Sequence, residues 1–190
     1  MQDLLLLTNT DSSEGFIKEL FMNATYGRIL NAYNHNDGAH LLEVHPFDIV
    51  LINAPLRMEL GDRFAKYAAL HTNTMVLFIA RESTYQLHYE ALSKLGVICV
   101  KKPVVVKPFQ QLLKILENSC QHLNLISKLS DSSPLIEEIR LVDAAKWHLI
   151  NQFSISESQA GRIVDQYAFD NALSKTVSAT RILEGAISAL

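Results

Sequence analysis

The chain has 190 residues, 48% of them hydrophobic, and a formal net charge of −3 at pH 7. This length is enough for one domain of ordinary size and a small second one, each with a buried core. The charge excludes a strongly basic surface overall, so any nucleic-acid binding must depend on local patches. The apolar run 4–7 is too short for a membrane span and lacks the features of a signal peptide. We therefore expect a cytoplasmic protein that does not contact the membrane.

In the first half of the chain, short apolar runs alternate with helical patterns, as βαβ units on a parallel sheet require. The predicted strands are residues 4–7, 28–32, 49–52, 75–79 and 97–100, and the predicted helices are 13–22, 37–44, 60–71 and 85–95. The strands are almost wholly apolar, which indicates helices on both faces of the sheet. The pattern predicts a flavodoxin-like α/β domain with a five-stranded parallel sheet over residues 1–107, and a site at the carboxyl ends of its strands.

Residues 108–132 are predicted to form a helical linker that begins after Pro108, a residue suited to a first helical turn. Its apolar residues recur at spacings of three and four: Leu113, Leu116, Cys120 and Leu123. This short seam is compatible with packing on the parent domain and with a dimerising coiled coil. We favour the coiled coil, and with it a homodimer.

Residues 133–190 are predicted to form an all-α three-helix bundle. Ser133 can cap the first helix, whose apolar stripe is Leu135, Ile139, Val142, Leu149 and Phe153. Ser156 and Gln159 indicate a capping box for the second helix, and Ser174 can cap a third that carries apolar residues as far as Leu190. Trp147 points away from the stripe, so we expect it to pack on the linker helix or a partner subunit, with stacking on a base as the less favoured alternative.

The three helices contain short groups of residues in a characteristic order. The first has Ile139-Arg140-Leu141-Val142, Ala145-Lys146 and Leu149-Ile150, the second Ser156, Ala160-Gly161-Arg162 and Ala168-Phe169-Asp170, and the third Ala179 and Ile182-Leu183. Together with the α/β half, this order resembles a response-regulator receiver domain followed by an ANTAR domain, the RNA-binding module of bacterial transcription antitermination regulators.

The resemblance implies binding of paired RNA stem-loops in a leader transcript, which prevents formation of the overlapping terminator. Unpaired loop bases can be contacted on their edges while cations hold the phosphates. The candidate RNA-binding residues are Lys146, Arg162, Arg140 and Lys175. Arg162 lies opposite the apolar face of its helix, where it either contacts RNA or is simply solvated. Lys146 projects into the apolar sector, where it is either a fixed cation beside the bundle or a side chain that extends past the core edge.

A receiver domain holds Mg²⁺ with acidic residues after its first strand and accepts phosphate on an aspartate after its third. The resemblance places Thr8, Asn9, Asn53, Ala80 and Lys102 at the positions of this site. An amide cannot form the acyl phosphate, and neutral ligands hold a hard divalent cation poorly. Asp11 and Asp48 lie at the wrong places to substitute. Lys102 is expected to bond Asn53 or a carbonyl.

We therefore predict a pseudo-receiver that is used for dimerisation or for docking a regulatory protein. A small ligand in the vacated site and control by protein abundance are the alternative inputs. No cofactor and no metal site are predicted, because His35, His40 and His45 follow one another at steps of five residues, which do not align on a helix face. No nucleophile with a base indicates an enzyme.

Two further functions compete with RNA binding. A protein-interaction adaptor with two degenerate domains is supported by the segment from Lys128 onward, where eight acidic residues exceed six basic ones. The segment between the second and third helices holds only one cation, Lys175, where relatives often carry several. A DNA-binding output is weaker, because no helix carries the cluster of basic and amide side chains of a recognition helix.

Overall fold

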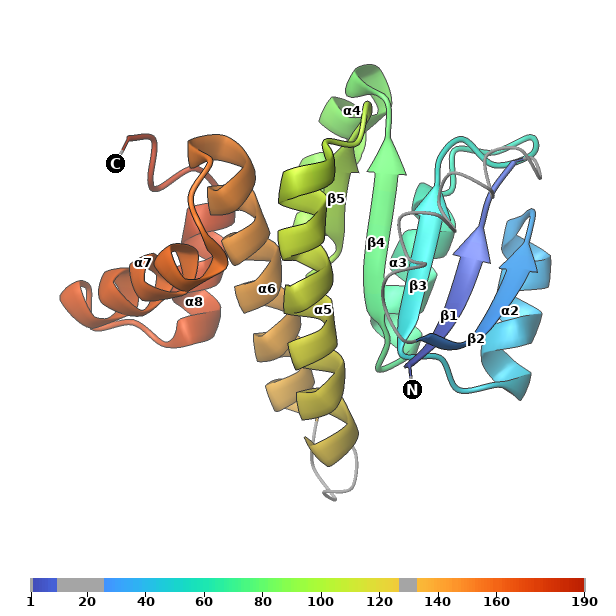
Figure 1. Cartoon of the computed structure of the whole chain (residues 1–190), viewed down its shortest axis with the longest axis horizontal. Coiled ribbons are helices and arrows are strands. Elements are labelled where there is room, and N and C mark those ends of the chain that lie inside the picture. The colour runs from blue at the N-terminus through green and yellow to red at the C-terminus, as the bar shows by residue number, and fades with distance from the viewer. Residues whose placement is uncertain (1, 10–25, 127–132, 190) are drawn as a thin grey trace.

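The computed structural model describes residues 2–9, 26–126 and 133–189. Its strands are β1 (Gln2–Leu7), β2 (Tyr26–Ala32), β3 (Ile49–Asn53), β4 (Met75–Ala80) and β5 (Ile98–Lys101). They form one parallel sheet in the order β2-β1-β3-β4-β5 (Figure 1). The flavodoxin-like sheet is therefore confirmed, with strand ends within two residues of the predicted ones. The helix predicted at 13–22 lies outside the described residues.

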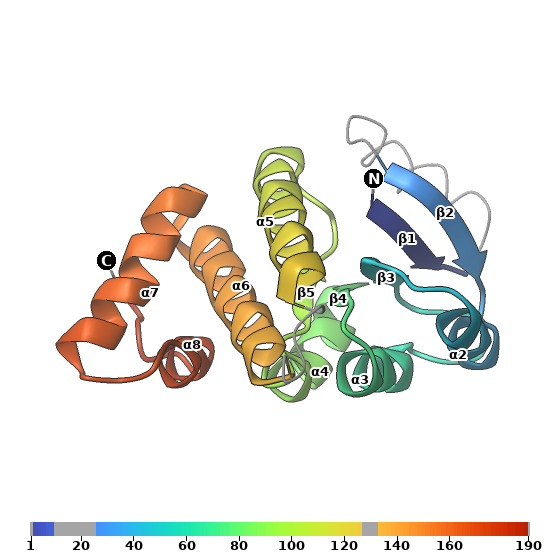
Figure 2. The ribbon, with the colours of Figure 1, turned by 90° about the horizontal axis from the view of Figure 1, so that it is seen from below.

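Successive residues of each strand face opposite sides of the sheet, so the apolar runs build two cores. Leu5 and Leu7 of β1 lie in a core with α2 (His35–Val44), α3 (Asp62–His71) and α4 (Glu82–Ser93). Leu4 and Leu6 face the other core, which contains α5 (Val106–Ile126). Figure 2 shows the two helical layers on opposite faces of the sheet.

The apolar seam of α5 is used inside the chain. Leu113, Leu116, Cys120 and Leu123 are all buried, and they share a core with the sheet and with α6 (Ser133–Phe153). The coiled-coil interpretation is therefore corrected in favour of packing on the parent domain, because these side chains are already covered. Sequence periodicity reveals an apolar face but does not identify what covers it.

The remaining helices are α7 (Glu157–Asp170) and α8 (Lys175–Leu183), which contact α6 and each other. The predicted capping box is confirmed: the Gln159 amide donates to Ser156 Oγ at 3.3 Å, and the Ser156 amide donates to Gln159 Oε1 at 2.9 Å. Ser174 caps α8 as predicted. Helix α8 ends earlier than expected, before Gly185, whose φ of +92° favours glycine.

Helix α6 lies between the sheet edge and the α7–α8 pair (Figure 2). Leu135 of the predicted stripe is 44% exposed, whereas Arg140, Ala144 and Trp147 are buried. The prediction of a single apolar stripe on this helix was therefore incomplete, because α6 is covered by other elements on two sides. One continuous hydrophobic core runs from the sheet through α6 to α8. Within the described ranges, no helix is both long and apolar enough to cross a membrane.

Candidate functional site

Thr8, Asn9, Asn53, Ala80 and Lys102, which the resemblance places at a receiver's phosphorylation site, gather at one edge of the sheet. The reason is that parallel strands end at the same side. Thr8 is fully buried and Asn53 is 8% exposed. Asn53 Nδ2 donates to Thr8 Oγ1 at 3.5 Å, which is a long hydrogen bond. Asn9 and Ala80 follow β1 and end β4, respectively. The structure thus brings these predicted residues to a common place.

Lys102 is the cation among the five residues that the resemblance places at this edge. Its Nζ donates to the Ala54 carbonyl at 2.6 Å, which is the carbonyl alternative predicted from the sequence. Burial lowers the pKa of Lys102, and the positive charge of Arg81 lowers it further. The ammonium is thus half-buried beside another cation and bonded to a neutral acceptor.

At this edge, neutral side chains stand at the positions where phosphotransfer in a receiver domain would require carboxylates. Asn53 ends β3 and offers an amide, and Thr8 and Asn9 offer a hydroxyl and an amide after β1. Asp48 lies at the opposite end of β3, where its Oδ2 accepts a hydrogen bond from the Asp3 amide at 2.7 Å. Asp11 lies outside the described residues. No carboxylate occupies the five assigned positions, so they offer neither a phosphate acceptor nor a hard-cation ligand set.

Two arginines at this edge were missed by the sequence analysis. Arg57 packs its guanidinium 4.6 Å from the centroid of the Tyr33 ring, and its Nε donates to the Asn9 carbonyl at 3.3 Å. Arg81 directly follows β4. Their positions in the sequence could have identified them, because both arginines follow predicted strands in loops at the carboxyl edge of the sheet. Arg57 also lines an open hollow of about 530 Å³ with His35 and other residues.

Arg140 was predicted to contact RNA, and the structure corrects this prediction. The residue is 6% exposed, and its guanidinium donates to the carbonyls of Ala69 at 2.6 Å and of Thr72 and Thr74 at 2.5 Å. All three carbonyls belong to the receiver-like domain. Arg140 therefore joins α6 to that domain and is almost wholly withdrawn from solvent.

Lys146 and Lys175 are held in ion pairs. Lys146 Nζ lies 3.1 Å from the nearly buried Asp143 carboxylate and 3.9 Å from Glu157. Asp143 also accepts a hydrogen bond from Ser119 of α5. Lys175 Nζ lies 2.9 Å from Asp165, where both side chains are more than half exposed. Lys146 is thus the more constrained cation, and Lys175 remains accessible.

Arg162 is the candidate that stays free. It is exposed on α7, and within 2–9, 26–126 and 133–189 it has no hydrogen-bond or ion-pair partner through its side chain. Figure 2 shows α7 on the outer side of the molecule, with α6 between it and the sheet. The guanidinium is therefore available to an external ligand.

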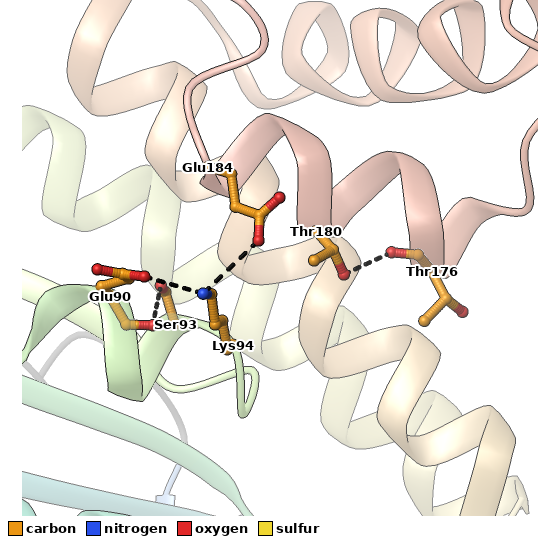
Figure 3. A network of polar contacts seen from close by, with 6 residues as sticks. All are labelled: Glu90, Ser93, Lys94, Thr176, Thr180 and Glu184. Carbon is orange, nitrogen blue, oxygen red and sulfur yellow. Dashed lines mark hydrogen bonds and ion pairs between the residues drawn. The ribbon is translucent and has the colours of Figure 1, made fainter.

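The two parts of the chain are joined by further polar contacts. The Trp147 indole nitrogen donates to the Cys99 carbonyl of β5 at 2.7 Å, so this side chain packs on the sheet edge, not on a partner or a base. The Tyr89 hydroxyl lies 2.6 Å from His148 Nδ1. At the surface, Lys94 lies 2.9 Å from Glu90 and 3.6 Å from Glu184 at the end of α8 (Figure 3).

The described part of the chain is thus a five-stranded parallel α/β domain followed by the helices α6, α7 and α8. No protein-family model matches the chain, and its sequence matches no curated protein. Solved structures are similar in fold. An uncharacterized protein from Neptuniibacter caesariensis has a TM-score of 0.57 at 15% identity, covering 68% of this chain and 97% of its own. An adenylate cyclase from Rhodopirellula baltica has a TM-score of 0.54 at 13% identity, covering 66% and 92%.

The match to full-length FixJ from B. japonicum extends over nearly the whole of both chains. Its TM-score is 0.53 at 12% identity, and the match covers 98% of each chain. At these identities the likeness concerns the fold alone. The chain therefore has a receiver-like fold similar to that of response regulators, and the cyclase activity named for the R. baltica protein is a statement about that protein.

Proposed function

We propose that this protein is a transcription antitermination regulator that binds paired RNA stem-loops through its three C-terminal helices. The proposal is supported by the order of the parts, a receiver-like fold followed by three helices that carry the residues of the ANTAR resemblance. The observation that carries it is Arg162, an exposed guanidinium on the outer face of α7 without an internal partner. A guanidinium in this situation binds phosphate or a base edge through its planar set of donors.

The proposed RNA binding requires two copies of the chain. Residues 133–189 contain five Lys or Arg and seven Asp or Glu. Arg140 is buried, and Lys146 and Lys175 are ion-paired. One copy therefore attracts phosphate weakly. Two linked copies that engage two stem-loops gain affinity through effective concentration, so the proposal includes a homodimer.

The receiver-like domain is proposed to act without phosphate. Asn53 stands where an acceptor aspartate would be needed, and Lys102 bonds a carbonyl. We propose that a regulatory protein supplies the input at this domain. Incubation with acetyl phosphate and Mg²⁺, followed by intact-mass measurement, is expected to show no stable phosphorylated species. A phosphorylated fraction above that of a heat-denatured control would contradict this part of the proposal.

The RNA-binding proposal is tested by gel-shift with an RNA that carries two small stem-loops, at several salt concentrations. The wild type is expected to bind at low salt and to lose affinity steeply as salt rises. Arg162→Ala is expected to weaken binding, and Lys114→Ala, which removes an exposed cation of α5, serves as the matched control. Equal loss in both variants would indicate a general charge effect.

A second candidate function is a protein-interaction adaptor without nucleic-acid binding. It is favoured by the excess of acidic residues in 133–189 and by the engagement of three of the five cations there. Failure of the wild type to bind the two-loop RNA even at low salt would favour the adaptor.

A further inference from the structure

Phe169 is an exposed aromatic ring on α7. Its exposed fraction is 82%, and it is the only exposed aromatic residue among the Phe, Tyr and Trp side chains whose burial the structure describes. Phe169 is not among the residues of the hydrophobic core in the described part of the chain, although α7 has an inner face formed by the buried residues Ala160, Val164 and Ala168. A single exposed apolar side chain is common on protein surfaces and does not by itself indicate a binding site.

Phe169 and Arg162 lie on the same face of α7. They are seven residues apart, which is nearly two helical turns, so both project from one side and are separated by about 10 Å along the helix axis. Gln166 lies between them on this face and is also exposed. The face of α7 opposite its buried residues thus presents a guanidinium, an amide and an aromatic ring. Figure 2 shows α7 at the end of the molecule far from the sheet.

The acidic residues on this face of α7 determine whether a phosphate binds more favourably near Arg162 or near Phe169. Asp165 is balanced by Lys175 at 2.9 Å. Asp170 adjoins Phe169, and its carboxylate accepts a hydrogen bond from Gln166 Nε2 at 2.6 Å. This carboxylate repels a phosphate at the Phe169 end, where a neutral base face is tolerated. A phosphate is attracted to Arg162 instead, because this cation lies more than two helical turns from the Asp170 carboxylate.

We propose that Phe169 is a stacking platform for an unpaired loop base of RNA, while Arg162 holds a backbone phosphate of the same loop. An aromatic ring stacks on any base through its π-face, and a neighbouring guanidinium anchors the strand. The spacing along α7 is comparable to one or two nucleotides of a single strand. This inference rests on the proposed RNA binding and adds to it the contact made by the base.

The test compares variants for binding to an RNA with two stem-loops and to the same RNA with abasic loops. Phe169→Ala is expected to weaken binding of the intact RNA about 10-fold, and Phe169→Trp is expected to retain it. The salt slope should be unchanged in Phe169→Ala but reduced by about one in Arg162→Ala, because only the arginine neutralises a phosphate. With the abasic RNA, Phe169→Ala should bind like the wild type.

Leu87→Ala is the matched control, since Leu87 is 71% exposed on α4 and its removal should leave binding unchanged. Circular dichroism should show the wild-type helix content for each variant, as expected for changes at exposed positions. If the wild type binds and Phe169→Ala binds equally well, the stacking inference is overturned while the proposed function stands. A tenfold loss that persists with abasic loops would also overturn it. If the wild type does not bind, both fail.

Discussion

Arg140 is a buried cation whose hydrogen-bond partners are all backbone carbonyls. Ala69 lies in the last turn of α3 and Thr72 caps that helix, so the guanidinium also lies against the negative end of the helix dipole. Burial lowers the pKa of Arg140 to about 10, and its Nε is buried without a hydrogen-bond partner among the described residues. Arg140 therefore stabilises the junction of the two parts through its hydrogen bonds to these three carbonyls.

Replacing Arg140 should destabilise the whole protein. Arg140→Met leaves the buried carbonyls of Ala69 and Thr74 and the partly buried carbonyl of Thr72 without this donor. We expect a loss of about 3 kcal/mol of unfolding free energy. Urea denaturation measures this loss. Arg181→Met, which changes an exposed arginine of α8, is the control and should stay within about 0.5 kcal/mol. Similar losses in both variants would show that the buried carbonyl contacts contribute little.

His148 should make stability depend on pH. Its Nδ1 lies 2.6 Å from the Tyr89 hydroxyl, and burial lowers its pKa below the usual 6.5, with a weaker opposing effect from Gln152. Between the folded and unfolded pKa values, the unfolded state binds the proton more readily. Stability should therefore fall as pH drops below 6.5 and level off below the folded pKa.

The measurement is urea denaturation between about pH 5 and 8 for the wild type and His148→Gln. The difference in unfolding free energy between the two proteins should change across this window, because the other histidines are common to both. A constant difference would mean that His148 does not titrate differently on folding.

At the scale of the elements, α6 packs closely on the turn before β5. Gly96 in this turn has a φ of +71°, and an added Cβ would lie 2.5 Å from the Arg140 Cβ. Real Cβ atoms do not approach this closely, so α6 would have to move away from the sheet edge. Glycine thus serves two needs at this position, the left-handed backbone and the close approach of the helix.

A pair of alanine substitutions separates these two needs. Gly185 has a φ of +92°, and no atom of the described residues lies within 4 Å of an added Cβ, so Gly185→Ala introduces the backbone strain alone. Gly96→Ala should lose about 1 to 3 kcal/mol more unfolding free energy than Gly185→Ala, because it also displaces α6. Thermal or urea denaturation provides the comparison. Equal losses would indicate that α6 shifts at no energetic cost.

For the whole molecule, the continuous core predicts that the two parts unfold together. Core residues of the sheet, α5, α6, α7 and α8 pack in one cluster. The exposed Lys94 to Glu184 ion pair adds little to this junction, because solvent screens it (Figure 3). The buried contacts of α6 are therefore expected to hold the parts together.

Trp147 offers a direct measurement of this cooperation. It is the only tryptophan of the chain, and its indole bonds β5 across the junction. In a urea titration, Trp147 fluorescence and far-UV circular dichroism should follow the same transition, as two-state unfolding requires. A fluorescence transition at lower urea would show that the helices detach before the domains unfold.

Sequence by itself determined the features that depend on local patterns. The five apolar strands, the capping box at Ser156 and the cap at Ser174 were predicted because each is specified by neighbouring residues. The gathering of Thr8, Asn53 and Lys102 followed from a general rule, since parallel strands end at one edge. The order of an α/β domain before three helices was also predicted, because strand and helix periodicity are local patterns of the sequence.

Only the tertiary structure decided which side chains remain available. Arg140 and Arg162 both lie on predicted helices, yet one is buried against three carbonyls and the other is free in the described structure. What covers the apolar seam of α5 and the second buried face of α6 was likewise decided by the elements that pack on them. The physical reason is that helical periodicity fixes which residues share a face, whereas burial depends on elements that are distant in the sequence and meet only in the folded chain.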